Sequence, residues 1–190
     1  MNTRHRLFIA VNLAEKIKKE LIVCQEEIAA SFADCDPIRW TRKDNLHITL
    51  LYLGDSKTES LPEICRLTEE TVKKQEAFAL NLKKVCLDPN QKMVWAVGEE
   101  NQILKATKSD LEKILLEKQN NNLNEENHPF FPHVTLGRIN RWQWRGIDPE
   151  EMPQIEREIS LDFSVDSIEI MESELKRGGP QYTILESIAL

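Results

Sequence analysis

The feature that most constrains this chain is a short motif that occurs twice, each time inside an apolar segment. The copies are Leu46-His47-Ile48-Thr49-Leu50 and Pro132-His133-Val134-Thr135-Leu136, with the two histidines 86 positions apart. Apolar residues that alternate with His and Thr predict a β-strand, where residues two apart point to the same face. Each strand would present His and Thr on one face and apolar side chains to a core. Two such strands are suited to line a cleft.

The rest of the chain alternates between extended and helical patterns. The predicted strands cover 7–13, 38–40, 45–53, 77–87, 93–97, 131–139, 159–171 and 181–190, and the predicted helices cover 14–30, 62–75, about 103–115 and a short acidic segment from 148. Several neighbouring strands have only turn-length connections, which favours an antiparallel or mixed α+β sheet over a parallel one. A strand, a helix and a motif strand occur before residue 55 and again between about 93 and 139. This repetition predicts two similar lobes.

Composition limits the classes of partner. Of the 190 residues, 41% are hydrophobic, which is enough for a core in one domain of residues 1–190. The formal net charge of −7 argues against a protein that wraps long nucleic acid, because that affinity comes from neutralising many phosphates. It leaves room for a site that grips a single phosphate through a few arginines.

Cysteine usage and hydropathy point to a soluble protein. Cys24, Cys35, Cys65 and Cys86 form no C-x-x-C pair, so the sequence predicts reduced thiols and no metal site. The apolar run 7–11 is too short for a signal peptide, and no stretch approaches the roughly 20 apolar residues of a membrane span. We therefore expect a cytoplasmic monomer without a cofactor or a membrane partner.

Two matched His-Thr strands suit acid–base chemistry at phosphorus. Histidine has a pKa near operating pH, so one imidazole can act as a base while the other acts as an acid. Threonine hydroxyls can donate hydrogen bonds to phosphate oxygens, where negative charge builds in the transition state. A single H-x-T sequence is a weak signal, but a matched pair in similar surroundings is specific. The sequence thus predicts a site formed by His47, Thr49, His133 and Thr135.

With these motifs in place, the chain resembles the two-histidine (2H) phosphoesterases, in particular the bacterial RNA 2′,3′-cyclic phosphodiesterases, also called 2′-5′ RNA ligases. The resemblance runs nearly end to end. It rests on Arg6-Leu7-Phe8-Ile9-Ala10, Arg39-Trp40, the stretch 45–54 that contains His47, the stretch 129–138 that contains His133, and Gly179-Pro180-Gln181-Tyr182. It implies an α+β fold of two intertwined, pseudo-symmetric lobes with outer helices around a central cleft. Each lobe would contribute one motif strand, 45–53 and 131–139.

The resemblance also implies roles for residues. His47 would be the general acid on the leaving ribose oxygen, and His133 the general base for water. Arg138 would contact the phosphate together with Thr49 and Thr135. Two positions depart from the common family pattern: His128 replaces an arginine, and Tyr52 replaces the commoner phenylalanine.

Further candidates for substrate contact lie near the motifs. Arg138 is five residues after His133, an offset that points to the opposite face of a regular strand unless a strand end or bulge turns it back. Possible base or RNA contacts are Phe130, Arg39, Trp40, Trp142 and Trp144. Aromatic and cationic side chains of this kind can stack on unpaired bases. An ordinary structural role is favoured for Arg39, Trp40, Trp142 and Trp144, and the two roles are balanced for Phe130.

The motifs therefore predict an enzyme that opens a cyclic phosphate without a metal ion, and the resemblance implies that its substrates are RNA-terminal or nucleoside 2′,3′-cyclic phosphates and its products 2′-phosphomonoesters. One alternative is a 2′-5′ RNA ligase or 2′-5′ phosphodiesterase with the same site. Another is a non-catalytic module that binds RNA ends or nucleotides, which would have no need for two titratable groups.

Overall fold

A computed structural model describes residues 4–32, 36–88, 91–119, 130–145 and 154–190. The strands are β1 (Arg4–Asn12), β2 (Ile38–Trp40), β3 (His47–Lys57), β4 (Phe78–Asp88), β5 (Met93–Gly98), β6 (His133–Ile139), β7 (Glu156–Val165), β8 (Ser167–Lys176) and β9 (Gly179–Ala189). The helices are α1 (Glu15–Ala30), α2 (Leu61–Val72), α3 (Gln102–Gln119) and α4 (Arg141–Arg145), with 3-10 turns at Lys43–Asn45 and Thr58–Ser60. The predicted α+β class is confirmed.

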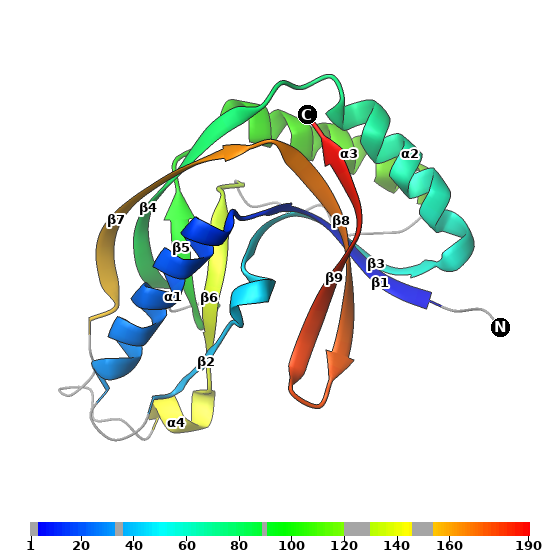
Figure 1. Cartoon of the computed structure of the whole chain (residues 1–190). Helices are drawn as coiled ribbons and strands as arrows, with labels where there is room; N and C mark the ends of the chain where they lie inside the picture. Colours follow the sequence, from blue (N-terminus) through cyan, green and yellow to red (C-terminus); the bar gives the residue numbers. More distant parts are fainter. Residues whose placement is uncertain (1–3, 33–35, 89–90, 120–129, 146–153) are drawn as a thin grey trace.

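All described strands belong to one antiparallel sheet in the order β7-β4-β5-β6-β3-β1-β8-β9, and β2 pairs with the edge of β6. Figure 1 shows this sheet bent into an arch. The motif strands β3 and β6 are neighbours at its centre, where they pair through Ile48 and Val134. The two motifs, far apart in the sequence, therefore lie side by side. The division into two lobes remains a prediction.

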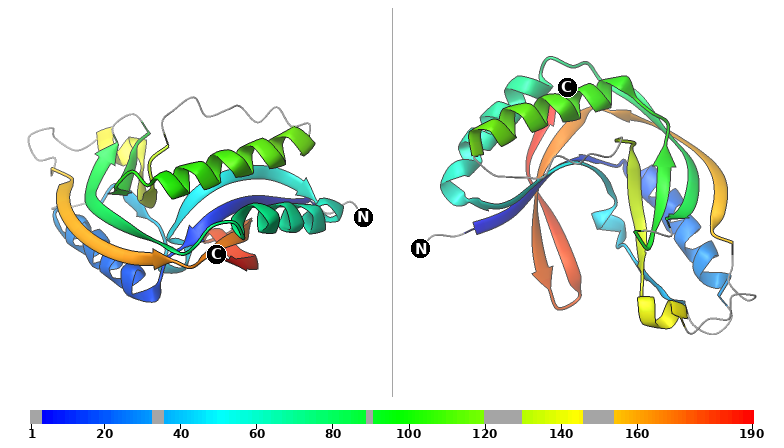
Figure 2. Two further views of the ribbon diagram at one scale, coloured as in Figure 1. Left: turned by 90° about the horizontal axis from the view of Figure 1, so that it is seen from above. Right: turned by 180° about the vertical axis from the view of Figure 1, so that it is seen from behind.

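By strand order, β7, β4, β5, β6 and β2 form one half of the sheet, and β3, β1, β8 and β9 form the other. Helices α1 and α3 each follow a strand of one half and pack against a strand of the other. Helix α1 follows β1 in the chain but packs against β6, whereas α3 precedes β6 but packs against β3 and α2. Figure 2 shows α3 running along β3 on the side opposite to α1. Each half thus buries its apolar face under a helix from the other half. The core contains Leu7, Ile9, Leu21, Leu46, Ile48, Leu50, Leu53, Leu82, Leu104, Leu111, Leu115, Val134 and Leu136, all at most 2% exposed.

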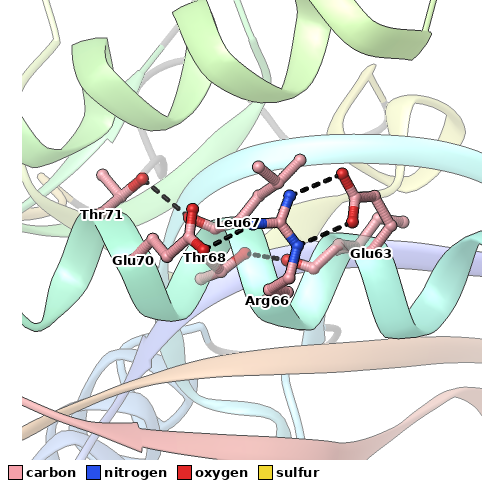
Figure 3. Close-up of polar contacts among 7 residues, drawn as sticks. Glu63, Arg66, Leu67, Thr68, Glu70 and Thr71 are labelled. Carbon is pink, nitrogen blue, oxygen red and sulfur yellow. Dashed lines mark hydrogen bonds and ion pairs between the residues drawn. The ribbon is translucent and has the colours of Figure 1, made fainter.

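Helix α2 has one buried and one charged face. Thr68 and Thr71 are buried and donate hydrogen bonds to the carbonyls of Ile64 and Leu67. Arg66 pairs with Glu63 and Glu70 on the exposed face, as the close-up in Figure 3 shows. Pairs one turn apart on an exposed helix face add little stability individually. The buried face of the helix packs against α3 and β9.

One predicted strand is wrong. Residues 159–171 were expected to form one strand, but the chain leaves β7 at Val165 and enters β8 at Ser167. These two strands lie in different halves, with β7 beside β4 and β8 beside β1. The residues around Asp166 carry neither Gly nor Pro, so the local pattern gives no sign of the crossing. The acidic helix expected from 148 lies outside the described residues.

Candidate active site

The ring of His47 is held by hydrogen bonds at both nitrogens. Its Nδ1 lies 2.7 Å from the carbonyl oxygen of Asn45, and its Nε2 lies 2.9 Å from the hydroxyl of Thr49. A carbonyl oxygen can only accept, so Nδ1 carries a proton and Nε2 is the nitrogen that titrates. In the neutral ring, the Thr49 hydroxyl donates to Nε2. Asn45 is itself buried, and its side-chain amide donates to the carbonyl of Pro180 at 2.7 Å.

His133 is held in the corresponding way. Its Nδ1 lies 3.1 Å from the carbonyl oxygen of Phe131, two residues earlier in the chain, as Asn45 is to His47. Its ring also packs against the ring of Trp95, with centroids 4.6 Å apart. Both motif histidines are therefore oriented by the backbone immediately before their strand, and in both the Nδ1 nitrogen carries a proton.

Burial lowers the pKa of His47 from its ordinary 6.5 to about 4. The hydrogen bond to Asn45 opposes this shift, while positive charge on Lys18 and on His133 adds to it. The interaction with His133 is consistent with the pairing of their strands. In the unliganded protein, His47 is therefore neutral at pH 7.

A β-bulge at the same place in each motif strand determines what lies beyond the threonine. In β3, Thr49 pairs with Ala10 and Leu51 pairs with Ile9, which leaves Leu50 as an extra residue. In β6, Thr135 pairs with Trp95 and Gly137 with Val94, which leaves Leu136 as the extra residue. A bulge shifts the alternation of faces by one residue. The residue five positions after each histidine is consequently exposed, with buried neighbours on both sides.

These two exposed residues are Tyr52 and Arg138. The bulge in β6 turns Arg138 to the same side as His133 and Thr135, despite the odd offset. Its cross-strand neighbour is Arg39 of β2, which is also exposed. The positive charge of Arg138 acts on the hydroxyl of Tyr182, so it lies near the β9 strand of the other half. The Arg39 guanidinium also reaches that strand, because a Cβ built on Gly179 would lie 2.4 Å from its Nη2.

A cavity of about 490 Å³ adjoins His47 and is lined mainly from β1, β3 and the β8–β9 hairpin. Its lining residues are Arg6, Phe8, His47, Tyr52, Asp55, Ser173, Leu175, Pro180 and Tyr182. A second cavity of about 340 Å³ lies beside the rings that pack on His133. It is lined by Lys84, Cys86, Leu87, Asp88, Trp95, Val97 and Phe131. The first cavity is lined by His47 itself, and the second is lined by Trp95 and Phe131, whose rings contact His133.

None of the four aromatic residues proposed from sequence as base contacts lines either cavity. Phe130, Trp40 and Trp144 are partly buried and pack against the core. The indole N–H of Trp40 is bonded to the Asp36 carboxylate, and the Phe130 ring lies under the ammonium of Lys108. Trp142 is 84% exposed on α4. Arg39 alone among these candidates is placed beside another site candidate, Arg138.

Sequence reasoning gave no role to Tyr52, Tyr182, Phe8 or Trp95. A signal for Tyr52 was present, since it occupies the same offset from His47 as Arg138 does from His133. Within the described residues, no three His, Cys, Asp or Glu side chains are grouped so that they could hold a metal ion. Of the helices described, none combines the length and apolar character needed to cross a membrane.

Comparison with known proteins gives consistent matches over the chain. Residues 25–177 match the family model of the 2′-5′ RNA ligase superfamily. The RNA 2′,3′-cyclic phosphodiesterase of Thermus thermophilus is 28% identical over 191 residues, which covers 97% of this chain and 90% of the relative. The protein of the same name from Archaeoglobus fulgidus is 29% identical over 185 residues and covers 93% and 96%.

Solved structures are similar over the whole chain as well. The protein TT0787 of Thermus thermophilus has a TM-score of 0.77 at 27% identity and covers 97% of both chains. Escherichia coli LigT complexed with 3′-AMP also has a TM-score of 0.77, at 24% identity over 99% of both chains. The latter similarity shows a shared fold.

Proposed function

The chain belongs to the 2′-5′ RNA ligase superfamily, and from this premise we propose that it hydrolyses 2′,3′-cyclic phosphates of RNA ends or nucleosides to 2′-phosphomonoesters. Relatives named RNA 2′,3′-cyclic phosphodiesterase support the proposal, since they align over at least nine-tenths of both chains. The observation that carries it is the pair of histidines on adjacent strands, each with its Nδ1 bonded to a backbone carbonyl two residues earlier.

In the proposed reaction, Nε2 of His133 takes a proton from water while the water oxygen attacks phosphorus. The bond from phosphorus to O3′ breaks, and the N–H at Nε2 of His47 donates its proton to O3′. The product carries a 2′-phosphate and a free 3′-hydroxyl. Hydroxyls of Thr49 and Thr135 and the guanidinium of Arg138 donate to the non-bridging oxygens, where charge develops. The proposed reaction uses no metal ion or cofactor.

The role of His47 as acid requires a proton that the free protein does not hold at pH 7, because its pKa there is about 4. An anionic phosphate next to Nε2 favours the charged imidazolium and raises this pKa. The proposal therefore includes substrate-assisted protonation of His47. The active pair carries one proton, and its kcat/KM is expected to be bell-shaped in pH.

The central test is hydrolysis of an RNA oligonucleotide that ends in a 2′,3′-cyclic phosphate, with EDTA in excess. We expect the wild type to release a 2′-phosphate, and His47→Ala and His133→Ala each to lower kcat/KM by roughly 10³-fold or more. His5→Ala is the matched control, because His5 bonds to Glu172 and Thr58 and lines neither cavity. A motif-histidine variant with near-normal turnover would contradict the paired role.

The proposed roles of His47 as acid and His133 as base can be distinguished with a substrate whose leaving group needs no proton. A nucleoside p-nitrophenyl phosphodiester has a leaving group stable without a proton. We expect this substrate to restore most of the rate lost in His47→Ala but not in His133→Ala. The opposite pattern would reverse the assignment of the two histidines.

The cavity beside His133 favours a second candidate function. A nucleoside bound against Trp95 and Phe131 would present a hydroxyl where the first reaction uses water, as cleavage or joining of a 2′-5′ linkage requires. Turnover of a 2′-5′-linked dinucleotide tests this candidate. Phe131→Leu is expected to lower that turnover more than the hydrolysis of a cyclic mononucleotide.

A further inference from the structure

Tyr52 occupies in β3 the position that Arg138 occupies in β6. Both residues follow a motif histidine by five positions, and each is exposed because its strand has a bulge at the corresponding place. Tyr52 is 60% exposed, and its hydroxyl lies 3.4 Å from the hydroxyl of Thr49. One half of the site thus presents a cation beside its threonine, and the other half presents an aromatic ring. The cation suits phosphate oxygens, whereas the ring suits an apolar or aromatic part of the ligand.

Tyr52 is one wall of an aromatic trough, by which we mean Phe8, Tyr52 and Tyr182. The Phe8 ring is 2% exposed, and it contacts the rings of Tyr52 and Tyr182 at centroid distances of 6.2 and 5.1 Å. Tyr182 also meets the His47 ring edge-on at 5.2 Å. The trough lies in the cavity beside His47, and its inner end is the imidazole itself.

Outside the trough, the same cavity is lined by one exposed apolar residue and two charged ones. Leu175 of the β8–β9 hairpin lines it and is 88% exposed. Arg6 and Asp55 line it as well, 3.7 Å apart and each more than half exposed. A flat group in the trough would have aromatic and aliphatic contacts on its faces and both a donor and an acceptor near its edge. A nucleobase has this combination of a π-face and a mixed polar edge.

The direction of the reaction selects which nucleoside lies there. This step rests on the proposed function. In an in-line displacement at phosphorus, the attacking water and the leaving O3′ lie on opposite sides. The ribose that carries O3′ therefore lies on the side of the acid, His47, and its base extends into the adjoining cavity. The opposite side, next to His133, is left for water.

We propose that the aromatic trough is the subsite for the base of the terminal nucleotide, and that Tyr52 stacks on that base. Recognition is by the π-face and tolerates all four bases, because the edge meets both a cation and a carboxylate. Purines bind more tightly than pyrimidines because they cover more of the rings.

The test compares adenosine 2′,3′-cyclic phosphate with 1-O-methylribose 2,3-cyclic phosphate, which lacks a base. For the wild type, we expect kcat/KM to be about 10- to 100-fold higher with adenosine, as the loss of one stacked base predicts. Tyr52→Ala is expected to bring this ratio close to one, chiefly through KM, and Tyr52→Phe to keep it. Trp142→Ala is the control on an exposed aromatic residue that lines neither cavity, and it is expected to keep the wild-type ratio.

The two proposals fail in different ways. If the wild type hydrolyses both substrates at equal kcat/KM, or Tyr52→Ala keeps the wild-type ratio, the base subsite is wrong and the hydrolase function stands. If the wild type hydrolyses neither substrate, the proposed function is wrong. Calorimetry with adenosine 2′-phosphate and ribose 2-phosphate then decides the subsite, because only a trough that binds the base makes their affinities differ in the wild type and converge in Tyr52→Ala.

Discussion

At the level of single residues, the backbone orients the two motif histidines. Each Nδ1–H donates to the carbonyl two residues earlier, at Asn45 and Phe131. This bond fixes the tautomer and the ring plane without adding negative charge beside the imidazole. His47 is consequently free to respond to burial and to nearby positive charge, and its pKa falls to about 4.

The lowered pKa of His47 makes stability depend on pH in a defined window. An unfolded histidine binds a proton near pH 6.5 and the folded one near pH 4, so the unfolded state holds more protons between these values. The unfolding free energy should fall as the pH drops from about 6.5 to 4, by on the order of 3 kcal/mol from this residue. His47→Asn retains an N–H for the Asn45 carbonyl but cannot titrate. Urea denaturation of wild type and His47→Asn should show a stability difference that shifts by this amount, and parallel pH curves would contradict it.

At the level of elements, two bulged strands build the site. The carbonyl of Leu136, the extra residue in β6, accepts hydrogen bonds from the Thr41 amide and the Gln25 side chain, each at 2.8 Å. Gln25 is buried on α1 and also donates to the Thr41 carbonyl. Helix α1 thus secures the bulge that turns Arg138 outward. The next residue, Gly137, pairs with Trp40 of β2.

Gly137→Ala should separate β2 from β6. A Cβ at this position would lie 2.4 Å from Cγ2 of Ile38 and 3.0 Å from Cε3 of Trp40, both in β2. Overpacking of this kind costs about 1–3 kcal/mol, measurable by chemical denaturation. Because β2 carries Arg39 opposite Arg138, the KM for cyclic phosphate should also rise.

The matched control is Gly178→Ala, where an added Cβ meets nothing within 4 Å. It should leave stability and KM near the wild-type values. If Gly137→Ala were as stable as the wild type, β2 would not be packed against the bulge as described.

At the level of the whole molecule, an acidic protein presents a few cations at one place. The net charge is −7, yet Arg39 and Arg138 are cross-strand neighbours, and Arg6 lines the cavity beside His47. The overall negative charge repels a long RNA chain, whereas the local arginines can bind the phosphate at the end of that chain. Affinity for RNA should therefore come from one or two phosphates and the terminal nucleoside rather than from chain length.

Salt dependence measures this restriction. With about two neutralised phosphates, a plot of log affinity against log salt for single-stranded RNA has a slope of about −1.4. We expect 1/KM for cyclic-phosphate oligonucleotides to follow this slope, so that KM rises with salt, and KM to be the same for a short and a long oligonucleotide. A slope that steepens with length would instead indicate an extended nucleic-acid surface.

The sequence by itself determined the features that depend on local pattern. Alternation in the two H-x-T segments placed His47, Thr49, His133 and Thr135 in strands, and the turn-length connections favoured the antiparallel α+β sheet that the structure has. The family resemblance was also present in the sequence, because the motifs and their apolar flanks are contiguous.

Only the tertiary structure decided which way several side chains point. The bulges at Leu50 and Leu136 arise from pairing with β1 and β5, so a period of two counted along either strand misplaces Tyr52 and Arg138. The break at Asp166 arises because β7 and β8 pair with different halves of the sheet. Tyr182 reaches His47 through the β8–β9 hairpin, 135 positions away in the chain. Alternation is a property of a strand alone, whereas bulges, crossings and side-chain neighbours depend on the strand opposite, which lies elsewhere in the sequence.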